Sequence, residues 1–428
     1  MMEKAFDNEM ERLKEEAEEE ERIKECRLER KGYFPPMSVE ELSEVLSLTI
    51  KKDKINKVVT FFCYLSAYTE DSQFNIIFNA PSSAGKSYIA LEVASLFPKE
   101  DVMARGYCSA KAFFHVRGEY SREKKALTVD LSRKILVFLD QPHSHLLEHM
   151  RPLFSHDKKE IHMQITDKTE KRGLRTKNLI LLGYPSVVFC TAGLNLDEQE
   201  ATRFLLLSPE TTQEKIAEGV IEAVRKGADP EAYFARLNSN PERQLLLHRI
   251  AAVKEEGITC VKIPKPKIIA ERFLATYKPW KPRHQRDVKR LMSLIQSHAL
   301  LNLWHRLTTD DLRVIIASQE DIEAAFRIWD EIATSQELNL PPYVLRLHEE
   351  VILALYQIKQ RGLRRNEILR FHVEVYGRPL SPQILGRDIL PSLEKAGLIY
   401  QKTDPDDKRN KLIYPILPGE DKASEPEN

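Results

Sequence analysis

The chain has 428 residues, of which 42% are hydrophobic and 30% are charged. That length allows roughly two to four domains with a sizeable core, and the composition excludes a mainly disordered protein. Because 65 basic residues balance 65 acidic ones, the net charge points to no nucleic-acid or membrane partner, and any such surface must come from local clustering of charge.

Cysteine usage and hydropathy indicate where the protein works. The five cysteines are scattered without a CxxC pair, which predicts neither a disulfide framework nor a zinc ribbon. No apolar stretch follows the first basic residues, so we expect no secretory signal. The most apolar stretch, Leu179 to Leu194, contains Pro185 and is shorter than the roughly 20 residues that span a bilayer. We interpret it as a buried strand in a cytoplasmic protein without membrane contact.

Residues 1–33 form the most highly charged segment. Between Glu3 and Lys31 there are 12 acidic and 8 basic residues and few apolar ones. This pattern favours a solvated helix over the alternative, an acidic arm that mimics nucleic acid or holds a partner.

Residues 34–72 predict a helical lead-in to the next domain. One helix is expected from Ser38, an N-cap with Glu41 three residues on, to about Leu48. A second is expected from about residue 53 to residue 68.

The pattern changes between about Phe74 and Leu207 to short β-branched or aromatic runs separated by helical stretches. The runs are FNIIF, ILVFL, IHMQI, LILL, VVFC and FLLL. Strands that alternate with helices over this length predict an α/β fold with a largely parallel sheet. We therefore assign residues 73–210 to an α/β core.

Helical periodicity returns after this core. It covers residues 211–338, with breaks at Pro230, Pro241 and the IPKPK segment near Lys265. Leu340-Pro341-Pro342 is the clearest linker in the chain. A compact module over residues 343–417 and a disordered tail over residues 418–428 are expected beyond it.

A phosphate-binding loop is the most specific motif. Residues 80–87 read APSSAGKS, directly after the apolar run FNIIFN and directly before the helical run YIALEVASLF. This strand, loop and helix context fits the P-loop, except that alanine stands in place of the first glycine. In such a loop the backbone amides cradle phosphate, the lysine adds charge and the hydroxyl binds Mg²⁺. The expected nucleotide-binding residues are Ala80, Pro81, Ser82, Ser83, Ala84, Gly85, Lys86 and Ser87.

A second strand should supply a carboxylate near the metal, and the run ILVFLD ends at Asp140. We expect Asp140 and Ser87 to hold Mg²⁺. The next residue is Gln141, where such ATPases usually carry a glutamate that activates water. Three explanations remain open: hydrolysis is slow, another group such as Glu148 is the base, or Gln141 orients the water.

A possible zinc motif lies beside this site. His145, Glu148 and His149 spell HxxEH, which marks some zinc peptidase helices. Because no third ligand is evident, we favour a helix that packs beside the nucleotide site.

The order of motifs resembles the ATPase core of AAA+ hexameric helicases, in particular the minichromosome maintenance family and the superfamily 3 helicases of viruses and plasmids. The resemblance rests on the loop, on Asp140, on the strand IHMQIT with the basic loop from Asp167 to Asn178, and on the segments CTA and TRF. It spans about residues 74–335, although residues 211–280 match nothing that we can name. It implies an AAA+ core with a helical lid, ATP and Mg²⁺ as cofactors, and a homo-hexameric ring.

The resemblance also implies roles for individual residues. In these families a hairpin projects a basic tip into a central channel, which makes Lys168, Lys171, Arg172 and Arg175 candidates for gripping single-stranded DNA. The alternative is an ordinary solvated surface hairpin that does not bind DNA.

Three further residues match motifs near the nucleotide. Thr191 falls near the sensor 1 position, where asparagine is more usual. Arg203 matches the arginine finger, which reaches the γ-phosphate of the neighbouring subunit. Arg286 begins the run RDVKRLMSLIQSHALL and is the sensor 2 candidate, unless it is only a surface arginine of the lid.

The C-terminal module predicts three helices followed by two strands around the polar turn of LIYQKTDPDDKRNKLIYPI. This arrangement is typical of a winged helix, and the turn resembles those of small prokaryotic regulators. From Arg361 to Pro415 there are 11 basic and 7 acidic residues, which suits phosphate contacts. Arg387, Lys408 and Arg409 are the candidates for duplex DNA, although many winged helices bind only protein.

Together these patterns predict an ATP-driven, ring-forming DNA motor, either a helicase or a replication protein associated with the nucleoid. Two alternatives remain. One is an initiator or loader that binds DNA, is switched by ATP binding and hydrolyses ATP slowly. The other is a transcription regulator that responds to ATP.

Overall fold

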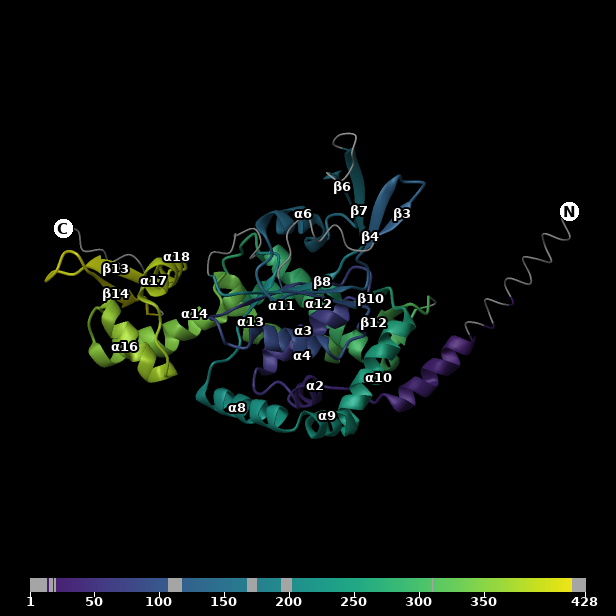
Figure 1. Ribbon diagram of the computed structural model, residues 1–428, viewed down its shortest axis with the longest axis horizontal. Helices are drawn as coiled ribbons and strands as arrows, with labels where there is room; N and C mark the ends of the chain where they lie inside the picture. Colours follow the sequence, from purple (N-terminus) through teal and green to yellow (C-terminus); the bar gives the residue numbers. More distant parts are fainter. Residues whose placement is uncertain are drawn as a thin grey trace.

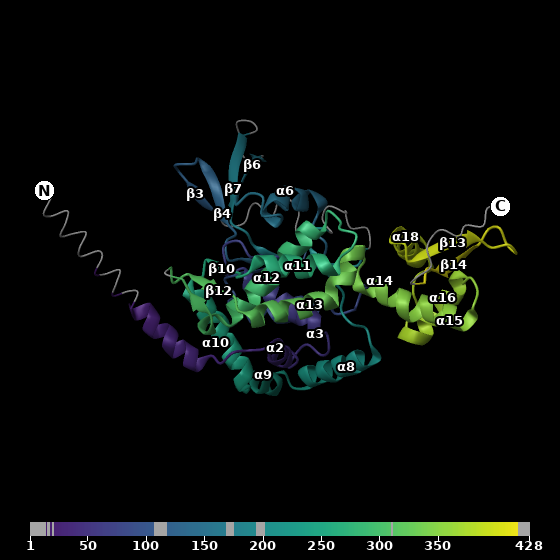
Figure 2. The same ribbon diagram turned by 180° about the vertical axis from the view of Figure 1, so that it is seen from behind.

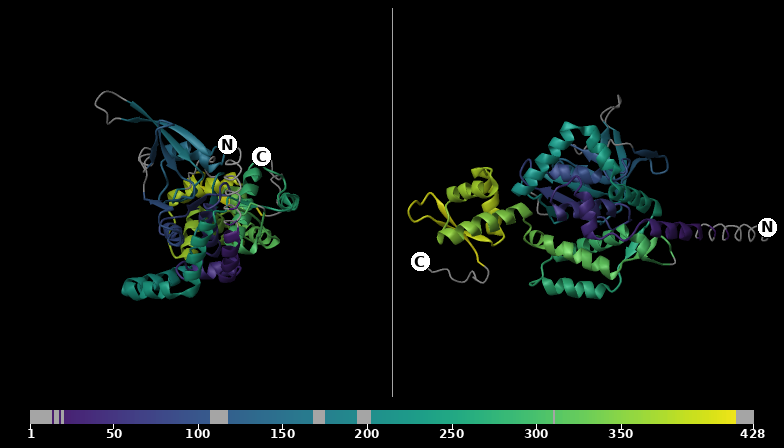
Figure 3. Two further views of the ribbon diagram at one scale, coloured as in Figure 1. Left: turned by 90° about the vertical axis from the view of Figure 1, so that its right-hand side faces the viewer. Right: turned by 90° about the horizontal axis from the view of Figure 1, so that it is seen from below.

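The computed structural model describes residues 14, 18, 21–106, 118–167, 175–193, 202–309 and 311–417. Its body is a mixed α/β structure with a parallel central sheet, and a smaller sheet projects from one side (Figure 1). The expected α/β character is thereby confirmed. The C-terminal module stands at one end of the body and the N-terminal helix at the other (Figure 3).

The central sheet has, in the described part of the chain, five parallel strands in the order β2-β5-β8-β1-β9. Four of them are the predicted runs that contain FNIIF, ILVFL, VVFC and FLLL. The strands are β1 (Ile76–Asn79), β2 (Val102–Arg105), β5 (Ile135–Phe138), β8 (Ser186–Thr191) and β9 (Leu205–Leu207). Because β1 lies between β8 and β9, the loop that follows it starts inside the sheet and not at an edge strand.

Side chains alternate between the two faces of this sheet, as strand geometry requires. Ile76 and Phe78 join one hydrophobic cluster, whereas Ile77 joins the cluster on the other face. The first cluster is covered by helices drawn from the lead-in, the core and the predicted lid. They are α2 (Val39–Leu46), α3 (Lys54–Ser66), α4 (Lys86–Ala94), α10 (Pro241–Glu256), α11 (Pro266–Thr276), α12 (His284–Leu301) and α13 (Gln319–Leu338).

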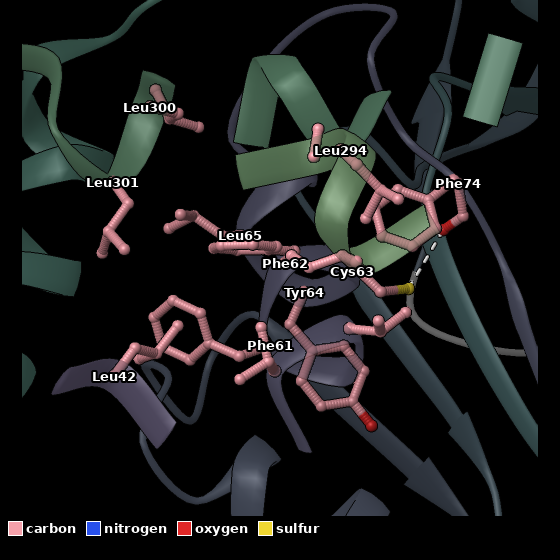
Figure 4. Close-up of a cluster of buried hydrophobic side chains, with 14 of the residues drawn as sticks. Leu42, Phe61, Phe62, Cys63, Tyr64, Leu65, Phe74, Leu294, Leu300 and Leu301 are labelled. Atoms are coloured by element: carbon pink, nitrogen blue, oxygen red, sulfur yellow. Dashed lines mark hydrogen bonds between the residues drawn. The ribbon is translucent and has the colours of Figure 1, made fainter. Parts of the chain in front are cut away.

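Helix α3 lies at the centre of the first cluster. All of its residues from Asn56 to Ser66 are buried, which is expected of a helix that other elements surround on every side. Phe61 and Phe62 pack among leucines of α2 and α12, and the Cys63 thiol donates to the Phe74 carbonyl oxygen at 3.0 Å (Figure 4). Figure 2 shows α12 and α13 crossing this side of the body. The lead-in, the α/β core and the helical segment after it, which the sequence pattern divides into separate segments, thus share one hydrophobic core.

The other face of the sheet packs against α6 (Ser144–Phe154) and the base of the second sheet. The second sheet has the order β3-β4-β7-β6 among the described strands. These strands are β3 (Glu119–Ser121), β4 (Ala126–Asp130), β6 (Glu160–Asp167) and β7 (Arg175–Leu182). Strands β6 and β7 are antiparallel neighbours, so a hairpin is present where the sequence predicted one.

Two expectations about this region were wrong. The runs IHMQI and LILL belong to the second sheet and not to the parallel one. The sequence predicts one strand from Leu179 to Leu194, but this stretch contains the end of β7 and all of β8, which belong to different sheets. The chain turns between them at Gly183, whose φ is 79° and where a Cβ atom would lie 2.0 Å from the Ser132 hydroxyl oxygen.

The segment after β9 is mainly helical but contains a small sheet that its sequence did not predict. Helices α8 (Gln213–Ala228) and α9 (Pro230–Ser239) lie along the edge of the body and lead into α10 (Figure 1). The small sheet has the order β10-β12-β11 in the described residues. Its parts are β10 (Cys260–Lys262), η1 (Leu303–His305), β11 (Leu307–Thr308) and β12 (Val314–Ile316).

The C-terminal module has its own hydrophobic cluster, which includes Val351, Ile368 and Leu390. Its first and third predicted helices are present but pass through π-helical turns at their centres. The elements are α14 (Pro342–Leu347), η2 (His348–Leu353), α15 (Ala354–Lys359), α16 (Arg365–Tyr376), α17 (Pro382–Ile384), η3 (Leu385–Ile389), α18 (Leu390–Lys395), β13 (Ile399–Thr403) and β14 (Lys411–Pro415). Strands β13 and β14 pair antiparallel.

The N-terminal helix is attached to the body at its C-terminal end. Residues 21–33 are helical, and Arg27 and Arg30 pair with the buried carboxylate of Glu256 at 2.6 and 2.9 Å. Trp304 donates to the same carboxylate. Burial alone would raise the pKa of Glu256, but the hydrogen bonds from Trp304, Arg27 and Arg30 lower it. None of the helices in the described ranges combines the length and apolar character needed to cross a bilayer.

Candidate phosphate-binding site

The Lys86 loop, residues 80–85, connects the end of β1 to the start of α4. Ser83 and Gly85 have φ values of 64° and 93°, in the left-handed region that glycine adopts without strain. Helix α4 begins at Lys86 directly after Gly85. A tight turn into the N-terminus of a helix exposes backbone N–H groups, and such groups together with the helix dipole attract anions.

Lys86 lies across the loop. Its ammonium donates to the carbonyl oxygens of Ala80 and Pro81 at 2.7 and 2.8 Å. Burial lowers the pKa of this lysine, and the nearby Asp140 carboxylate acts in the opposite direction. Both hydrogen-bond acceptors are uncharged, and no ion pair of Lys86 occurs within the described residues. Its positive charge is therefore available to an anion.

The polar residues at the ends of β5 and β8 lie beside this loop. The Ser87 hydroxyl donates to the carbonyl oxygen of Leu139 at 3.4 Å, so Ser87 lies next to Asp140. The Thr191 hydroxyl donates to the side-chain oxygen of Gln141 at 3.0 Å. Asn79 at the end of β1 donates to the Gly193 carbonyl oxygen at 2.7 Å. The carboxyl ends of three neighbouring parallel strands thus meet, which is where open α/β sheets bind ligands.

The donor set suits Mg²⁺ bound together with phosphate. Mg²⁺ retains several water molecules and takes one or two protein oxygens in addition to phosphate oxygens. Ser87 supplies a hydroxyl and the exposed Asp140 supplies a carboxylate. In the part of the chain that the structure describes, no group of three or more His, Cys, Asp or Glu residues is arranged to hold a metal ion by itself.

A cavity of about 460 Å³ adjoins the Lys86 loop. Ser83, Ala84 and Gly85 line one side of it. Apolar side chains from other segments line much of the rest: Ile50, Tyr88, Ile89, Ile216 and Val220. Sequence reasoning missed this cavity because its residues come from segments far apart in the chain, and those outside the Lys86 loop carry no motif. Its position and apolar lining suit the base and sugar of a nucleotide whose phosphates bind the loop.

Arg203 and Arg286 lie at the opposite edge of the sheet. The Leu205 amide donates to the Asn75 carbonyl oxygen at 2.8 Å, which fixes the start of β9 beside the start of β1. Arg203 precedes this point and donates to the Ser155 hydroxyl oxygen at 2.7 Å. Arg286 of α12 donates to the Thr202 hydroxyl oxygen. The two arginines are therefore close to each other and separated from Lys86 by the length of the strands.

The HxxEH residues lie on the exposed side of α6 near the end of β5. The ring nitrogen Nδ1 of His145 is 3.2 Å from the Glu148 carboxylate. The ring of His145 stacks on that of His143, with centroids 5.1 Å apart. Glu148 therefore already has a partner on its own helix.

The candidate DNA contacts are only partly described. Lys168, Lys171 and Arg172 lie outside the described residues. Arg175 is the first residue of β7, where its backbone pairs with Asp167. In the C-terminal module, Arg387 on η3 and Lys408 in the turn between β13 and β14 are exposed. Arg409, the third candidate in this module, lies in the same turn, and its side chain pairs with Asp407 at 3.0 Å.

Comparison with models of known protein families finds none that matches this chain. No curated protein matches its sequence significantly either. The function is therefore inferred from the geometry and from the sequence pattern.

Proposed function

We propose that the protein is an ATP-dependent, ring-forming DNA motor of the AAA+ type that acts as a helicase or another replication protein. One observation carries the proposal: β8 lies between β1 and β5. This order brings the Lys86 loop, the carboxylate of Asp140 and the hydroxyl of Thr191 to one edge of the sheet. A nucleoside triphosphate site of the P-loop type needs the loop and the carboxylate together, and Thr191 adds a hydroxyl that can orient Gln141.

Each residue of the site has a role in this proposal. The backbone amides of the Lys86 loop and the Lys86 ammonium bind the phosphates, and Ser87 and Asp140 hold Mg²⁺. The metal ion, when bound, neutralises charge that develops on the phosphates. Gln141 orients the attacking water, and its side chain is itself oriented by Thr191. The cavity beside the loop receives the base and sugar.

The proposal includes a ring because the two candidate arginines lie far from Lys86 in their own chain. A guanidinium that acts on the transferred phosphate must come within hydrogen-bond distance of it. Arg203 and Arg286 lie at the amino edge of the sheet, so a neighbouring subunit must bring them to the nucleotide. A closed ring of identical subunits, a homo-hexamer by resemblance, gives every site the same pair of arginines.

DNA binding is proposed at two places. The hairpin of β6 and β7 projects away from the body (Figure 1), and a projecting hairpin with a basic tip suits a single strand in a central channel. The C-terminal module combines three helical segments with the ribbon of β13 and β14, which suits a winged helix on duplex DNA. The protein would then work in the cytoplasm at the nucleoid.

Gln141 favours a second candidate function. An amide cannot accept the proton of the attacking water as a carboxylate does. A protein with this site could bind ATP as a switch and turn it over slowly, as an initiator or loader on duplex DNA. Strand displacement on a forked substrate separates the two functions, because only the motor unwinds the fork.

The substitution Lys86→Ala tests the nucleotide site. We expect it to weaken binding of ATP by roughly tenfold or more, because it removes a charged partner of the phosphates, while the thermal unfolding midpoint stays the same. The matched control is Lys267→Ala, because Lys267 is an exposed lysine on α11. Calorimetric titration with ATP and Mg²⁺ measures both variants. Equal ATP affinity in the parent and Lys86→Ala would show that the Lys86 loop is not the phosphate site.

A further inference from the structure

The cavity beside the Lys86 loop is not formed by the body alone. Tyr376 and Arg378 of the C-terminal module also line it. They flank Gly377, which ends α16 with a φ of 68°. The cavity therefore lies between the phosphate loop and the module.

The structure of the module fixes the position of these two residues. The Tyr376 hydroxyl donates to the Glu350 carboxylate at 2.6 Å, so the ring is anchored within the module. The Nδ1 nitrogen of the buried His372 lies 3.0 Å from the Arg378 carbonyl oxygen. Burial lowers the pKa of His372, the contact with the Arg378 carbonyl acts in the opposite direction, and an Nδ1–H group can donate to that carbonyl. The turn that carries Arg378 is thus a defined part of the module.

Among the described residues, the polar contacts between the module and the body include three hydrogen bonds. The Gln213 side chain donates to the Tyr376 carbonyl oxygen at 3.1 Å. The Arg346 side chain donates to the Pro209 carbonyl oxygen at 2.8 Å, and the Tyr343 amide donates to the Ser208 hydroxyl oxygen at 3.3 Å. Each such hydrogen bond contributes only about 0.5–1.5 kcal/mol. An additional contact at this boundary would change the docking of the module appreciably.

The lysines that line the cavity already have carboxylate partners, whereas Arg378 differs from them. Three lysines of the lining are paired with carboxylates: Lys51 with Glu222, Lys215 with Asp53, and Lys226 with Glu92. Arg378 is half-buried, and its guanidinium has neither an ion pair nor a hydrogen bond within the described residues. A planar cation in such a place can pair with phosphate oxygens or stack on an aromatic base.

We propose that a nucleotide bound by the Lys86 loop also contacts Arg378 and Tyr376, and so clamps the C-terminal module to the body. This inference rests on the proposed nucleotide site. Linkage requires that docking of the module strengthens nucleotide binding by the same factor by which nucleotide strengthens docking. The nucleotide state of the core therefore sets how firmly the module is held.

The first test measures nucleotide affinity. We expect Arg378→Ala to weaken binding of a non-hydrolysable ATP analogue about tenfold, at the lower end of what a charge-assisted hydrogen bond contributes. The affinity of Arg378→Lys for the analogue should lie between those of the parent and of Arg378→Ala, because lysine keeps the charge but lacks the planar guanidinium. The matched control is Arg370→Ala, an exposed arginine of α16 that does not line the cavity, and it should bind as the parent does.

The second test measures docking by hydrogen exchange of the backbone amides. In the parent, the ATP analogue should slow exchange around residues 374–380, and in Arg378→Ala this slowing should be lost. Gln213→Ala removes a docking contact from the side of the body. It should lower nucleotide affinity a few-fold without changing the charge of the cavity.

The outcomes separate this inference from the proposed function. If Lys86→Ala binds the analogue as tightly as the parent, the nucleotide site itself is wrong. If Lys86→Ala weakens binding but Arg378→Ala and Gln213→Ala do not, and nucleotide leaves exchange around residues 374–380 unchanged, the clamp alone is refuted.

Discussion

Gln141 follows Asp140 at the end of β5, and its side-chain oxygen accepts a hydrogen bond from the Thr191 hydroxyl. This contact fixes the direction of the amide, with its N–H₂ group turned away from Thr191. A side chain held in this way can orient a water molecule but cannot remove its proton. If hydrolysis is nevertheless fast, the proton must pass to another group.

We predict that Gln141→Glu does not increase the steady-state rate of ATP hydrolysis. The new carboxylate would accept the same hydrogen bond from Thr191 but would add negative charge beside the phosphates and Asp140. Rates measured with DNA for the parent, Gln141→Glu and Glu148→Gln test this expectation. A rise toward the roughly 10² to 10⁴-fold that general bases contribute would instead mean that the parent is slow for want of a base.

At the scale of elements, α12 and α13 are joined by a buried ionic cluster. Asp321 in the first turn of α13 is fully buried. It accepts hydrogen bonds from Arg306 at 2.6 and 2.7 Å and lies 2.6 Å from His298 of α12. Its other contacts cap α13 through Ser318. Burial alone would raise the pKa of Asp321, but the hydrogen bonds from His298 and Arg306 lower it to about 2.

We predict that Asp321→Asn lowers the free energy of unfolding by about 3–5 kcal/mol, because it leaves the buried guanidinium of Arg306 without its partner. The depressed pKa of Asp321 contributes roughly 2 to 3 kcal/mol above pH 4, and this contribution is lost as the pH falls from about 4 to about 2. Urea unfolding at pH 7 and at pH 3 measures both effects.

The control for this cluster is Glu320→Gln. Glu320 precedes Asp321 but is 81% exposed and lies 3.9 Å from Arg306, so its loss should change stability by less than about 1 kcal/mol. Equal effects of the two substitutions would mean that the burial of Asp321 does not determine its contribution.

Elements with strong periodicity could be predicted from the sequence, and the short ones could not. The helix α2 with its Ser38 cap and the strands β1, β5 and β8 follow from local patterns. By contrast, β10, β11 and β12 have two or three residues each, which is too short for any period to show. The last four residues of β7 are as apolar as β8, so the sequence marks the boundary between the two sheets only by the turn at Gly183.

The residues of the candidate site also divide into those that the sequence could predict and those that it could not. Lys86, Ser87 and Asp140 were found because a motif or a strand end marks them. Arg378 carries no such mark, and its position beside the Lys86 loop depends on how the C-terminal module docks. Contacts between segments nearly 300 residues apart are set by tertiary packing, which a single sequence does not encode in any local pattern.

At the scale of the whole molecule, the two edges of the central sheet carry different parts of one proposed reaction. Lys86 and Asp140 lie at the carboxyl edge, whereas Arg203 lies before β9 at the amino edge. A β-strand advances about 3.3 Å per residue, so the strands of this sheet keep the two sets of groups apart within one chain. Under the proposed function, two subunits in head-to-tail contact would complete the site, and such contacts form a ring where the rotation between subunits closes.

We predict that Arg203→Ala binds ATP as the parent does but loses hydrolysis, since an arginine finger stabilises the transition state and is worth roughly 10³ to 10⁵ in rate. Lys86→Ala should also be inactive, for lack of phosphate binding. When the two variants are mixed, some interfaces join an intact Lys86 loop of one chain to an intact Arg203 of the other. Those interfaces should hydrolyse ATP, so the mixture should be more active than either variant alone. The control is a mixture of Arg203→Ala with the double variant that carries both Lys86→Ala and Arg203→Ala. No chain in this mixture has an intact Arg203, so it should stay inactive. Failure of the first mixture to regain activity, under conditions where both variants assemble, would place Arg203 outside any shared site.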